Sequence, residues 1–293
     1  MFSLAKIVSV ALLAVQINGD LAPNPDLDTL DISLTQGVAT HPVHSHNTYD
    51  NGGMVKALEN GCISMEADVW FQSNELYIAH TTGEIDTTKT LDTMYLDGLF
   101  KLLQQSQDKG TNGLFIEDPS QTLHLLIDFK SAASDTYPLI KQKFQRFIDN
   151  NWLTYYDNNQ QKWIFRPLTV VLTGNQPDLT GEDTRYFTLD GDLTKLKNPD
   201  QQQIDEMKKY SVVASADMTK YLGTGLFQIR EFSSSEQNLL STGFTTATTN
   251  GLKSRLYGGV TWLGALQSRE NQQLYELGET LINIDDVTQA SLY

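Results

Sequence analysis

The segment from His44 to His80 combines residue types that hydrolytic chemistry uses. Glu66 and Asp68 lie two residues apart in an alternating segment, so on a strand both carboxylates point to the same face. Two carboxylates on one face suit a hard divalent cation. His46 precedes this pair and His80 follows it, and imidazoles close to such a site suit general acid, general base or nucleophile roles.

Short elements must position these side chains. A short amphipathic run that ends at Gly61 is typical of a helix with a C-terminal cap. The alternating segments 62–70 and 76–79 are predicted strands. The histidines and the carboxylate pair therefore lie on or just beyond strands of a strand, helix, strand unit.

Strands and helices alternate through the rest of the chain. The predicted strands are 123–129, 168–173, 185–188, 212–214, 256–262 and 280–284, and the predicted helices are 90–104, 137–152, 234–240 and 269–278. This alternation favours a parallel sheet covered by helices, and about eight strands favour an α/β fold of the (β/α)8 TIM-barrel type. No strand is followed by a glycine-rich phosphate-binding loop, which argues against a Rossmann or P-loop protein.

Composition and charge restrict the partners. The 293 residues have a net charge of −15 and an isoelectric point near 4.6, which disfavours nucleic acid and anionic membrane surfaces as partners. An anionic small-molecule substrate is compatible with this charge, because a bound cation reverses the local field. Cys62 is the single cysteine, so no intramolecular disulfide forms.

The amino-terminal segment has the features of a secretory signal. Lys6 supplies a positive charge, and residues 7–15 form an apolar run too short to span a bilayer. We predict a signal peptide over 1–19, a single barrel domain over 20–293, and a secreted or secretory-pathway protein. An N-terminal anchor or a buried helix is the alternative for the first segment. No later segment is long and apolar enough to span a membrane.

Polar side chains gather at or just past the ends of the predicted strands, where TIM barrels place their active sites. They are His46, Glu66, Asp68, His80, Asp128, Lys130, Asn175, Trp262 and Asp285. Structural roles explain some of them equally well. Lys130 can pair with Asp128, and Trp262 can pack in the core. A turn or helix cap accounts for Asn175 or Asp285.

Several of these segments carry a family resemblance. The segments HSHNTY, ALENGCISMEADVW, LYIAHT, TLDTMYLDGL, LTVVLTGNQP and LINIDD follow one another through most of the chain. Together they resemble the phospholipase C-like phosphodiesterase superfamily, which includes glycerophosphodiester phosphodiesterases. More narrowly, the chain looks like the fungal family named altered inheritance of mitochondria protein 6. The resemblance implies a distorted TIM barrel and a divalent metal.

The resemblance also implies roles for individual residues. It makes Glu66, Asp68 and Asp128 the metal ligands, His46 and His80 the acid–base pair, and Lys130, Trp262 and Asn47 contacts to the substrate. Two positions depart from the pattern. The narrower family usually has an acidic residue where this chain has Thr48, and the broader phosphodiesterases often have arginine in place of Asn47. His44 remains open, either as a further functional histidine or as a residue placed below the site.

These features lead to the hypothesis of a metal-dependent phosphoric diester hydrolase that acts on a phosphodiester or phospholipid. Three carboxylates match Mg²⁺ better than a Ca²⁺ cage, and Ca²⁺ is the alternative ion. A non-catalytic barrel that binds a metal or ligand is the second hypothesis. A glycoside hydrolase also uses paired carboxylates, but it gives no role to two histidines and a lysine. The sequence does not indicate an oligomeric state.

Overall fold

The computed structural model describes residues 26–46, 52–182, 184–198 and 200–293. The predicted signal peptide over 1–19 and the predicted substrate contact Asn47 lie outside these residues. None of the helices in the described ranges is long and apolar enough to cross a membrane.

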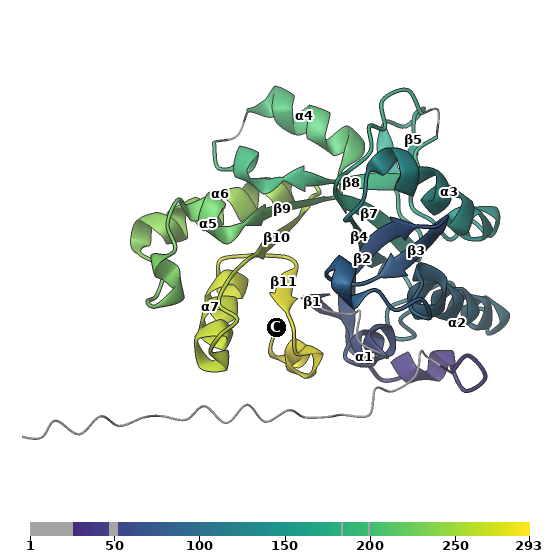
Figure 1. The fold of residues 1–293 in the computed structure, drawn as a ribbon. Coiled ribbons are helices and arrows are strands. Elements are labelled where there is room, and N and C mark those ends of the chain that lie inside the picture. The colour runs from purple at the N-terminus through teal and green to yellow at the C-terminus, as the bar shows by residue number, and fades with distance from the viewer. Residues whose placement is uncertain (1–25, 47–51, 183, 199) are drawn as a thin grey trace, which may run out of the picture.

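Eight parallel strands form a nearly closed barrel, as predicted (Figure 1). In chain order they are β1 (His41–Ser45), β2 (Cys62–Gln72), β4 (Leu123–Phe129), β7 (Leu168–Gly174), β8 (Phe187–Asp192), β9 (Val213–Asp217), β10 (Lys253–Tyr257) and β11 (Ile282–Ile284). Around the barrel the order is β10-β9-β8-β7-β4-β2-β1-β11. The two end strands approach each other where the Leu281 amide donates to the Ser254 carbonyl over 3.0 Å.

Three short strands lie outside the barrel. β3 (Glu75–Ile78) extends the sheet as an antiparallel partner of β2, whereas β5 (Tyr155–Asp157) and β6 (Lys162–Ile164) form a separate hairpin.

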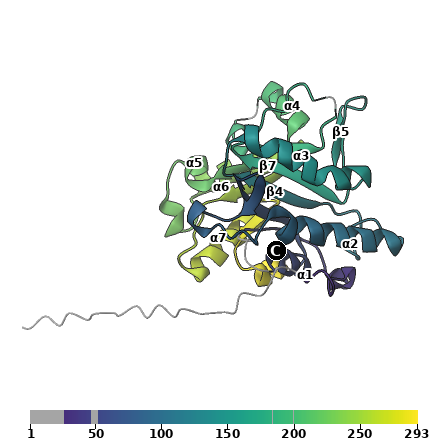
Figure 2. The ribbon, with the colours of Figure 1, turned by 45° about the vertical axis from the view of Figure 1, so that its right-hand side comes forward.

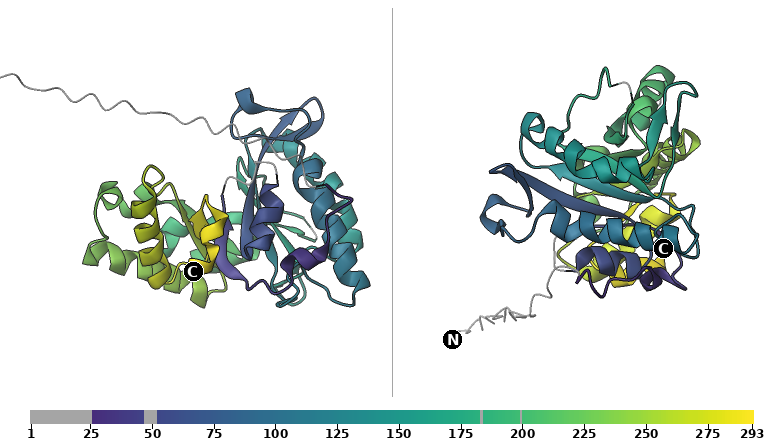
Figure 3. Two further views of the ribbon diagram at one scale, coloured as in Figure 1. Left: turned by 90° about the horizontal axis from the view of Figure 1, so that it is seen from below. Right: turned by 90° about the vertical axis from the view of Figure 1, so that its right-hand side faces the viewer.

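Helices surround the strands (Figures 2 and 3). The α-helices are α1 (Gly53–Glu59), α2 (Asp97–Asp108), α3 (Ala133–Asp149), α4 (Gln201–Tyr210), α5 (Met218–Leu222), α6 (Ser234–Thr249) and α7 (Gly264–Glu276). The shorter helical turns are η1 (Ile32–Thr35), η2 (Thr82–Glu84), η3 (Asp92–Leu96), η4 (Leu193–Leu196), η5 (Leu226–Gln228) and η6 (Val287–Leu292).

The apolar pattern explains how these layers pack. β4 is almost continuously apolar, as expected for a strand buried on both faces of a parallel sheet. On α3, residues such as Ile140, Phe144 and Phe147 recur at helical spacing and are fully buried. Phe147 meets Phe100 of α2 edge to face, with ring centroids 5.5 Å apart, so the two helices share one apolar layer outside the barrel.

One predicted strand is displaced along the chain. The sequence predicted a strand over 256–262, but β10 covers 253–257 and the chain then turns away. Gly258 causes the turn: its φ of +73° favours glycine, and a Cβ there would lie 2.7 Å from the Asp217 carboxylate. Arg255, which the prediction left outside any strand, therefore lies in the barrel wall.

The register of the strands places the polar residues at one level. Asp68 on β2 pairs with Asp128 on β4, so both carboxylates lie side by side on neighbouring parallel strands. Ser45 pairs with Ile284, which puts His46 next to Asp285 just beyond β1 and β11. The carboxyl ends of four strands thus bring most of the predicted site residues together.

Candidate active site

Glu66, Asp68 and Asp128 form a compact carboxylate cluster. One oxygen of each lies within 4.8 Å of the others. Gly174 at the end of β7 makes room for this cluster, since a Cβ at that position would lie 2.0 Å from Oδ1 of Asp128. The three residues that the sequence analysis assigned to a metal are therefore close enough to bind one ion.

Glu66 is held from two sides inside the barrel. Its Oε2 accepts a hydrogen bond from Nη2 of Arg255 over 2.7 Å and lies 3.1 Å from Nε2 of His44. Burial opposes ionisation of Glu66, but Arg255 and His44 outweigh it and hold the pKa of this carboxyl well below its usual range. Glu66 is therefore ionised, and Arg255 and His44 fix the orientation of its carboxylate.

His44 lies below the site. It is fully buried, and its second ring nitrogen, Nδ1, lies 2.7 Å from the Ser64 hydroxyl. Burial lowers the pKa of His44 to about 3, so the ring is neutral at ordinary pH. These contacts give His44 the role of a support for Glu66.

His80 reaches the cluster through Asp68. Nδ1 of His80 lies 3.1 Å from Oδ2 of Asp68, and the indole of Trp70 donates to the Ala79 carbonyl next to it. Burial raises the pKa of Asp68, and the nearby Glu66 carboxylate raises it further. A crowded, buried carboxylate of this kind requires positive charge close by to stay ionised.

Lys130 supplies part of that charge. Its Nζ lies 2.6 Å from Oδ2 of Asp128 and 3.4 Å from Oδ1 of Asp68. Burial opposes protonation of this amine, but the carboxylates, Asp128 first, raise the pKa of Lys130 overall. Lys130 therefore forms the ion pair that the sequence suggested. It also lines the cavity, and its contact with the substrate stays a prediction.

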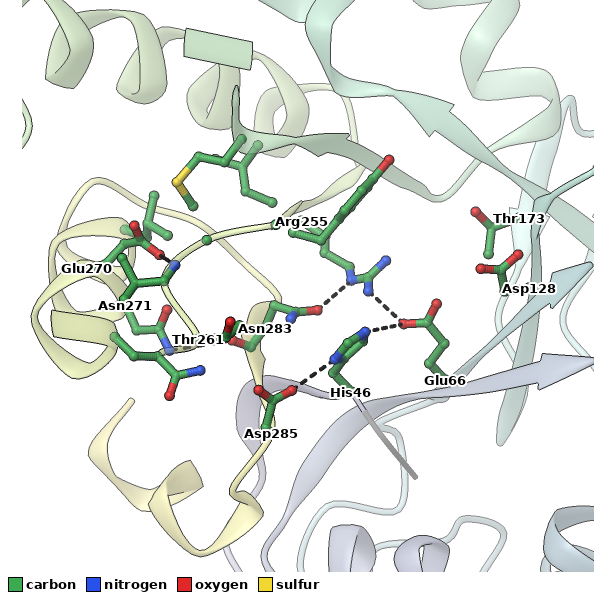
Figure 4. A pocket seen from close by; sticks show the side chains of 18 of the residues that line it. His46, Glu66, Asp128, Thr173, Arg255, Thr261, Glu270, Asn271, Asn283 and Asp285 are labelled. Carbon is green, nitrogen blue, oxygen red and sulfur yellow. Dashed lines mark hydrogen bonds and ion pairs between the residues drawn. The ribbon is translucent and has the colours of Figure 1, made fainter. Parts of the chain in front are cut away.

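His46 is oriented by Asp285, which directly follows the last strand, β11. Its Nδ1 lies 2.9 Å from Oδ1 of Asp285, and its Nε2 lies 4.0 Å from Oε2 of Glu66 (Figure 4). The bond from His46 lowers the pKa of Asp285. Because Asp285 occupies Nδ1, the nitrogen of His46 that faces the carboxylate cluster is Nε2.

A cavity of about 400 Å³ joins these groups. Its carboxylate side is formed by His46, Glu66, Asp68, His80, Asp128 and Lys130, which are the predicted catalytic residues, metal ligands and lysine. The opposite side comes from the end of β10, the loop after it and α7. Trp262, a predicted substrate contact, is 61% exposed and is not among the residues that line the cavity.

The residues present fit a divalent cation. Three carboxylates meet in the cluster, and within the described part of the chain the cationic side chains that contact them are Arg255 and Lys130, so three negative charges face two positive ones. An all-oxygen donor set of this size suits Mg²⁺, which takes few protein carboxylates and keeps several waters, or Ca²⁺. The crowding that raises the pKa of Asp68 is the condition that such an ion relieves.

Sequence reasoning missed Arg255 and its partner. Arg255 is 3% exposed, and its Nε donates to Oδ1 of Asn283 over 3.1 Å. Arg255 directly precedes the apolar residue Leu256, and a basic residue within an apolar strand would have drawn attention. The predicted strand began at Leu256, however, so Arg255 fell outside it. Asn283 lay inside a predicted strand, where nothing marked it as facing the cavity.

Comparison with known proteins identifies the family. Residues 32–186, more than half of the chain, match the model of the AIM6-like phosphodiesterase domain. This chain belongs to that family. The matched range includes Glu66, Asp68, Asp128, both predicted catalytic histidines and Lys130, whereas Arg255 and Asp285 lie beyond it.

Full-length relatives agree with this assignment. The protein named "Altered inheritance of mitochondria protein 6" of Saccharomyces cerevisiae (strain ATCC 204508 / S288c) is 32% identical over 287 residues, covering 90% of this chain and 74% of the relative. Its namesake in Lachancea thermotolerans is 33% identical, covering 88% of this chain and 67% of the relative. The Kluyveromyces lactis protein of the same name is also 33% identical, with coverages of 87% and 72%. The family predicted from the sequence is thus confirmed.

Proposed function

We propose that this member of the AIM6-like phosphodiesterase domain family is a metal-dependent phosphoric diester hydrolase. The observation that carries the proposal is the carboxylate cluster of Glu66, Asp68 and Asp128, which shares one cavity with two histidines and a lysine. A carboxylate holds Nδ1 of each histidine. The phosphodiesterase name of the matching domain supports the same reaction class.

The three carboxylates of the cluster would hold the metal. When bound, an Mg²⁺ ion supplies positive charge to the phosphate oxygens, whose negative charge grows in the transition state. Arg255 and His44 contribute by keeping one oxygen of Glu66 fixed. Metal selection between Mg²⁺ and Ca²⁺ then depends on how many waters the site retains.

The histidines act as the acid–base pair. Asp285 and Asp68 occupy the Nδ1 atoms of His46 and His80, which assigns proton transfer to the Nε2 atoms. One ring takes a proton from the attacking hydroxyl, or attacks phosphorus itself to form a phosphohistidine whose N–P bond water then cleaves, and the other ring protonates the leaving alcohol. Attack by a neighbouring substrate hydroxyl gives a cyclic product, and attack by water gives a monoester.

Lys130 contributes charge at the edge of the cluster. Its ammonium group already bridges Asp128 and Asp68, so it remains protonated at neutral pH. In that position it can donate to a non-bridging phosphate oxygen at the moment when charge develops there. The lysine thereby binds the phosphate group and leaves proton transfer to the histidines.

Hydrolysis by the purified chain tests the proposal. Soluble diesters and phospholipids are assayed with Mg²⁺, with chelator, and with the variants His46→Ala and Glu66→Ala. We expect activity only with the metal, and a loss of about 100- to 10,000-fold in kcat for His46→Ala, as for other general acids and bases. The control is His41→Ala, which removes a histidine from the opposite end of β1 and leaves the activity intact.

The alternative outcome is equally informative. If Mg²⁺ binds and no diester is cleaved, the chain is a metal-binding barrel without catalysis. If cleavage persists in chelator, the carboxylate cluster has another role.

A further inference from the structure

Exposed apolar side chains concentrate on two loops of this protein. Among the described residues, five of the nine large apolar side chains that are exposed lie in the segments 226–229 and 257–263. They are Leu226 (56% exposed), Ile229 (68%), Tyr257 (38%), Trp262 (61%) and Leu263 (48%), and we call them the rim surface. Soluble proteins rarely gather such residues without a binding partner.

The rim surface borders the cavity. Both segments follow the carboxyl ends of neighbouring strands, β9 and β10, which is the end where the carboxylate cluster lies. Tyr257 and Thr261 line the cavity itself. Helix α7 begins directly after the second segment and holds the first one, since Nη2 of Arg269 donates to the Phe227 carbonyl over 3.5 Å and to the Arg230 carbonyl over 2.9 Å.

Buried anchors fix the outward direction of Leu226 and Ile229. The neighbouring Phe227 is buried, and its ring packs 6.2 Å from that of Phe232. The guanidinium of Arg230 forms two hydrogen bonds of 2.7 and 2.9 Å with the carboxylate of Glu236 on α6. The loop is therefore tied to the barrel on either side of Ile229, and the apolar tips remain in solvent.

The charges around the rim surface differ from those of the whole chain. The chain has 36 acidic residues, yet none lies between Met218 and Arg230 or between Leu256 and Arg269. Lys220 is exposed within the first of these segments. Acidic groups border these segments, since Asp217 and Glu231 flank the first and Glu270 follows the second, but none lies within them. A phosphate-bearing surface that approaches the rim thus meets the apolar tips first.

We propose that the rim surface docks onto a bilayer of zwitterionic phospholipid, so that the cavity receives the phosphodiester of a lipid. An exposed tryptophan and tyrosine among aliphatic tips suit the boundary between headgroups and acyl chains. The net charge of −15 opposes anionic bilayers, which selects neutral ones. The inference rests on the proposed function for its substrate, while the docking itself stands on the surface alone.

Vesicle binding tests the docking. The purified chain is mixed with phosphatidylcholine vesicles, and partition is followed by co-flotation and by the emission of Trp262, with Trp262→Phe to assign the signal. We expect the emission of Trp262 to shift to the blue on binding. The double variant Ile229→Ser, Leu263→Ser should bind at least about tenfold more weakly, because it has two fewer apolar side chains to transfer from water into the bilayer. The matched control is Phe165→Ser, which removes a 48% exposed apolar side chain next to the amino end of β7.

A soluble diester, bis(p-nitrophenyl) phosphate, separates the two proposals. We expect the double variant to cleave it like the wild type while losing cleavage of vesicle phospholipid. Cleavage of the soluble diester without any vesicle binding by the wild type would overturn the docking and leave the proposed hydrolase intact. Vesicle binding without cleavage of any diester would overturn the proposed hydrolase and leave the docking intact. A dimer in sedimentation that the double variant abolishes, with no vesicle binding, would make the rim surface a protein interface and overturn the inference.

Discussion

Gly174 shows how a residue without a side chain shapes the carboxylate cluster. Its φ is +68°, a conformation that favours glycine, and a Cβ there would lie 2.0 Å from Oδ1 of Asp128 and 2.8 Å from the Phe129 carbonyl. The carboxylate of Asp128 therefore occupies the space that any other residue at position 174 would take.

Gly174→Ala is expected to weaken Mg²⁺ binding by about 10- to 100-fold, the range seen when the support of a metal ligand is disturbed. The added methyl group displaces the Asp128 carboxylate from Glu66 and Asp68. Isothermal titration with Mg²⁺ measures the change.

The control is Gly181→Ala. Gly181 has a φ of +88°, and among the described residues no atom would lie within 4 Å of a Cβ added there, so this substitution imposes the backbone strain alone. It should cost about 1 kcal/mol of stability and leave Mg²⁺ affinity unchanged. Equal losses of affinity in both variants would show that strain, and not the crowding of Asp128, is responsible.

The end of β10 is the element that the sequence described least well. The segment LYGGVTW was predicted as a strand over 256–262, but Gly258 and Gly259 turn the chain, and Glu270 of α7 fills the space beside Gly259. Because Glu270 belongs to a helix later in the chain, no pattern within the segment 256–262 indicates that the chain turns there. By contrast, β4 was predicted with its observed bounds, because an apolar run ending in Asp128 requires no distant partner.

Glu270 links this loop to the pH dependence of stability. Its Oε1 accepts a hydrogen bond from the Val260 amide over 2.9 Å, while its Oε2 is buried without a hydrogen-bond partner in the described structure. Burial raises the pKa of Glu270 from 4.5 to about 7. Between these two values the folded state holds a proton that the unfolded state has lost, so stability falls as the pH rises from 4.5 to 7.

Glu270→Gln removes the cost of ionising this buried carboxyl. At pH 8 its free energy of unfolding, measured with urea, should exceed that of the wild type by up to roughly 3 kcal/mol. At pH 4.5 the two proteins should differ little. Glu236→Gln is the control with the opposite expectation, because hydrogen bonds from Arg230 lower the pKa of Glu236 to about 2, and its loss destabilises at both pH values. A Glu270→Gln effect that does not change with pH would show that Glu270 is not protonated in the folded state.

At the scale of the whole molecule, the site combines residues from the middle of the strand order with residues from its two end strands, β10 and β11. Strands β1, β2 and β4 supply the histidine and carboxylates that the sequence revealed, because each lies at or near the end of a recognisable strand. Strands β10 and β11 supply Arg255 and Asn283, whose contacts appear only when the barrel closes. Asp285, which the sequence did mark, contacts His46 at the end of the neighbouring strand β1. Local patterns can therefore predict the carboxylate cluster but not Arg255 and Asn283, which reach it from across the barrel.

Arg255 couples this closure to the carboxylate cluster. It joins β10 to Glu66 on β2 across the barrel interior, between residues 189 positions apart in the chain. In chelator, Arg255→Met should cost about 3 kcal/mol of stability, because a buried carboxylate loses its main countercharge. With saturating Mg²⁺ the loss should be smaller, since the ion supplies positive charge to the same carboxylate and binds the folded state alone. Urea unfolding in both conditions measures the difference.

The matched control for this last prediction is Arg185→Met. Arg185 is also buried, but its guanidinium stacks over the rings of Tyr156 and Tyr210 at 4.2 and 4.9 Å, away from the carboxylates. Its removal should cost the same stability with chelator as with Mg²⁺. If Arg255→Met also lost equal stability in both conditions, Glu66 would not share its charge with a metal, and the ligand set would have to exclude it.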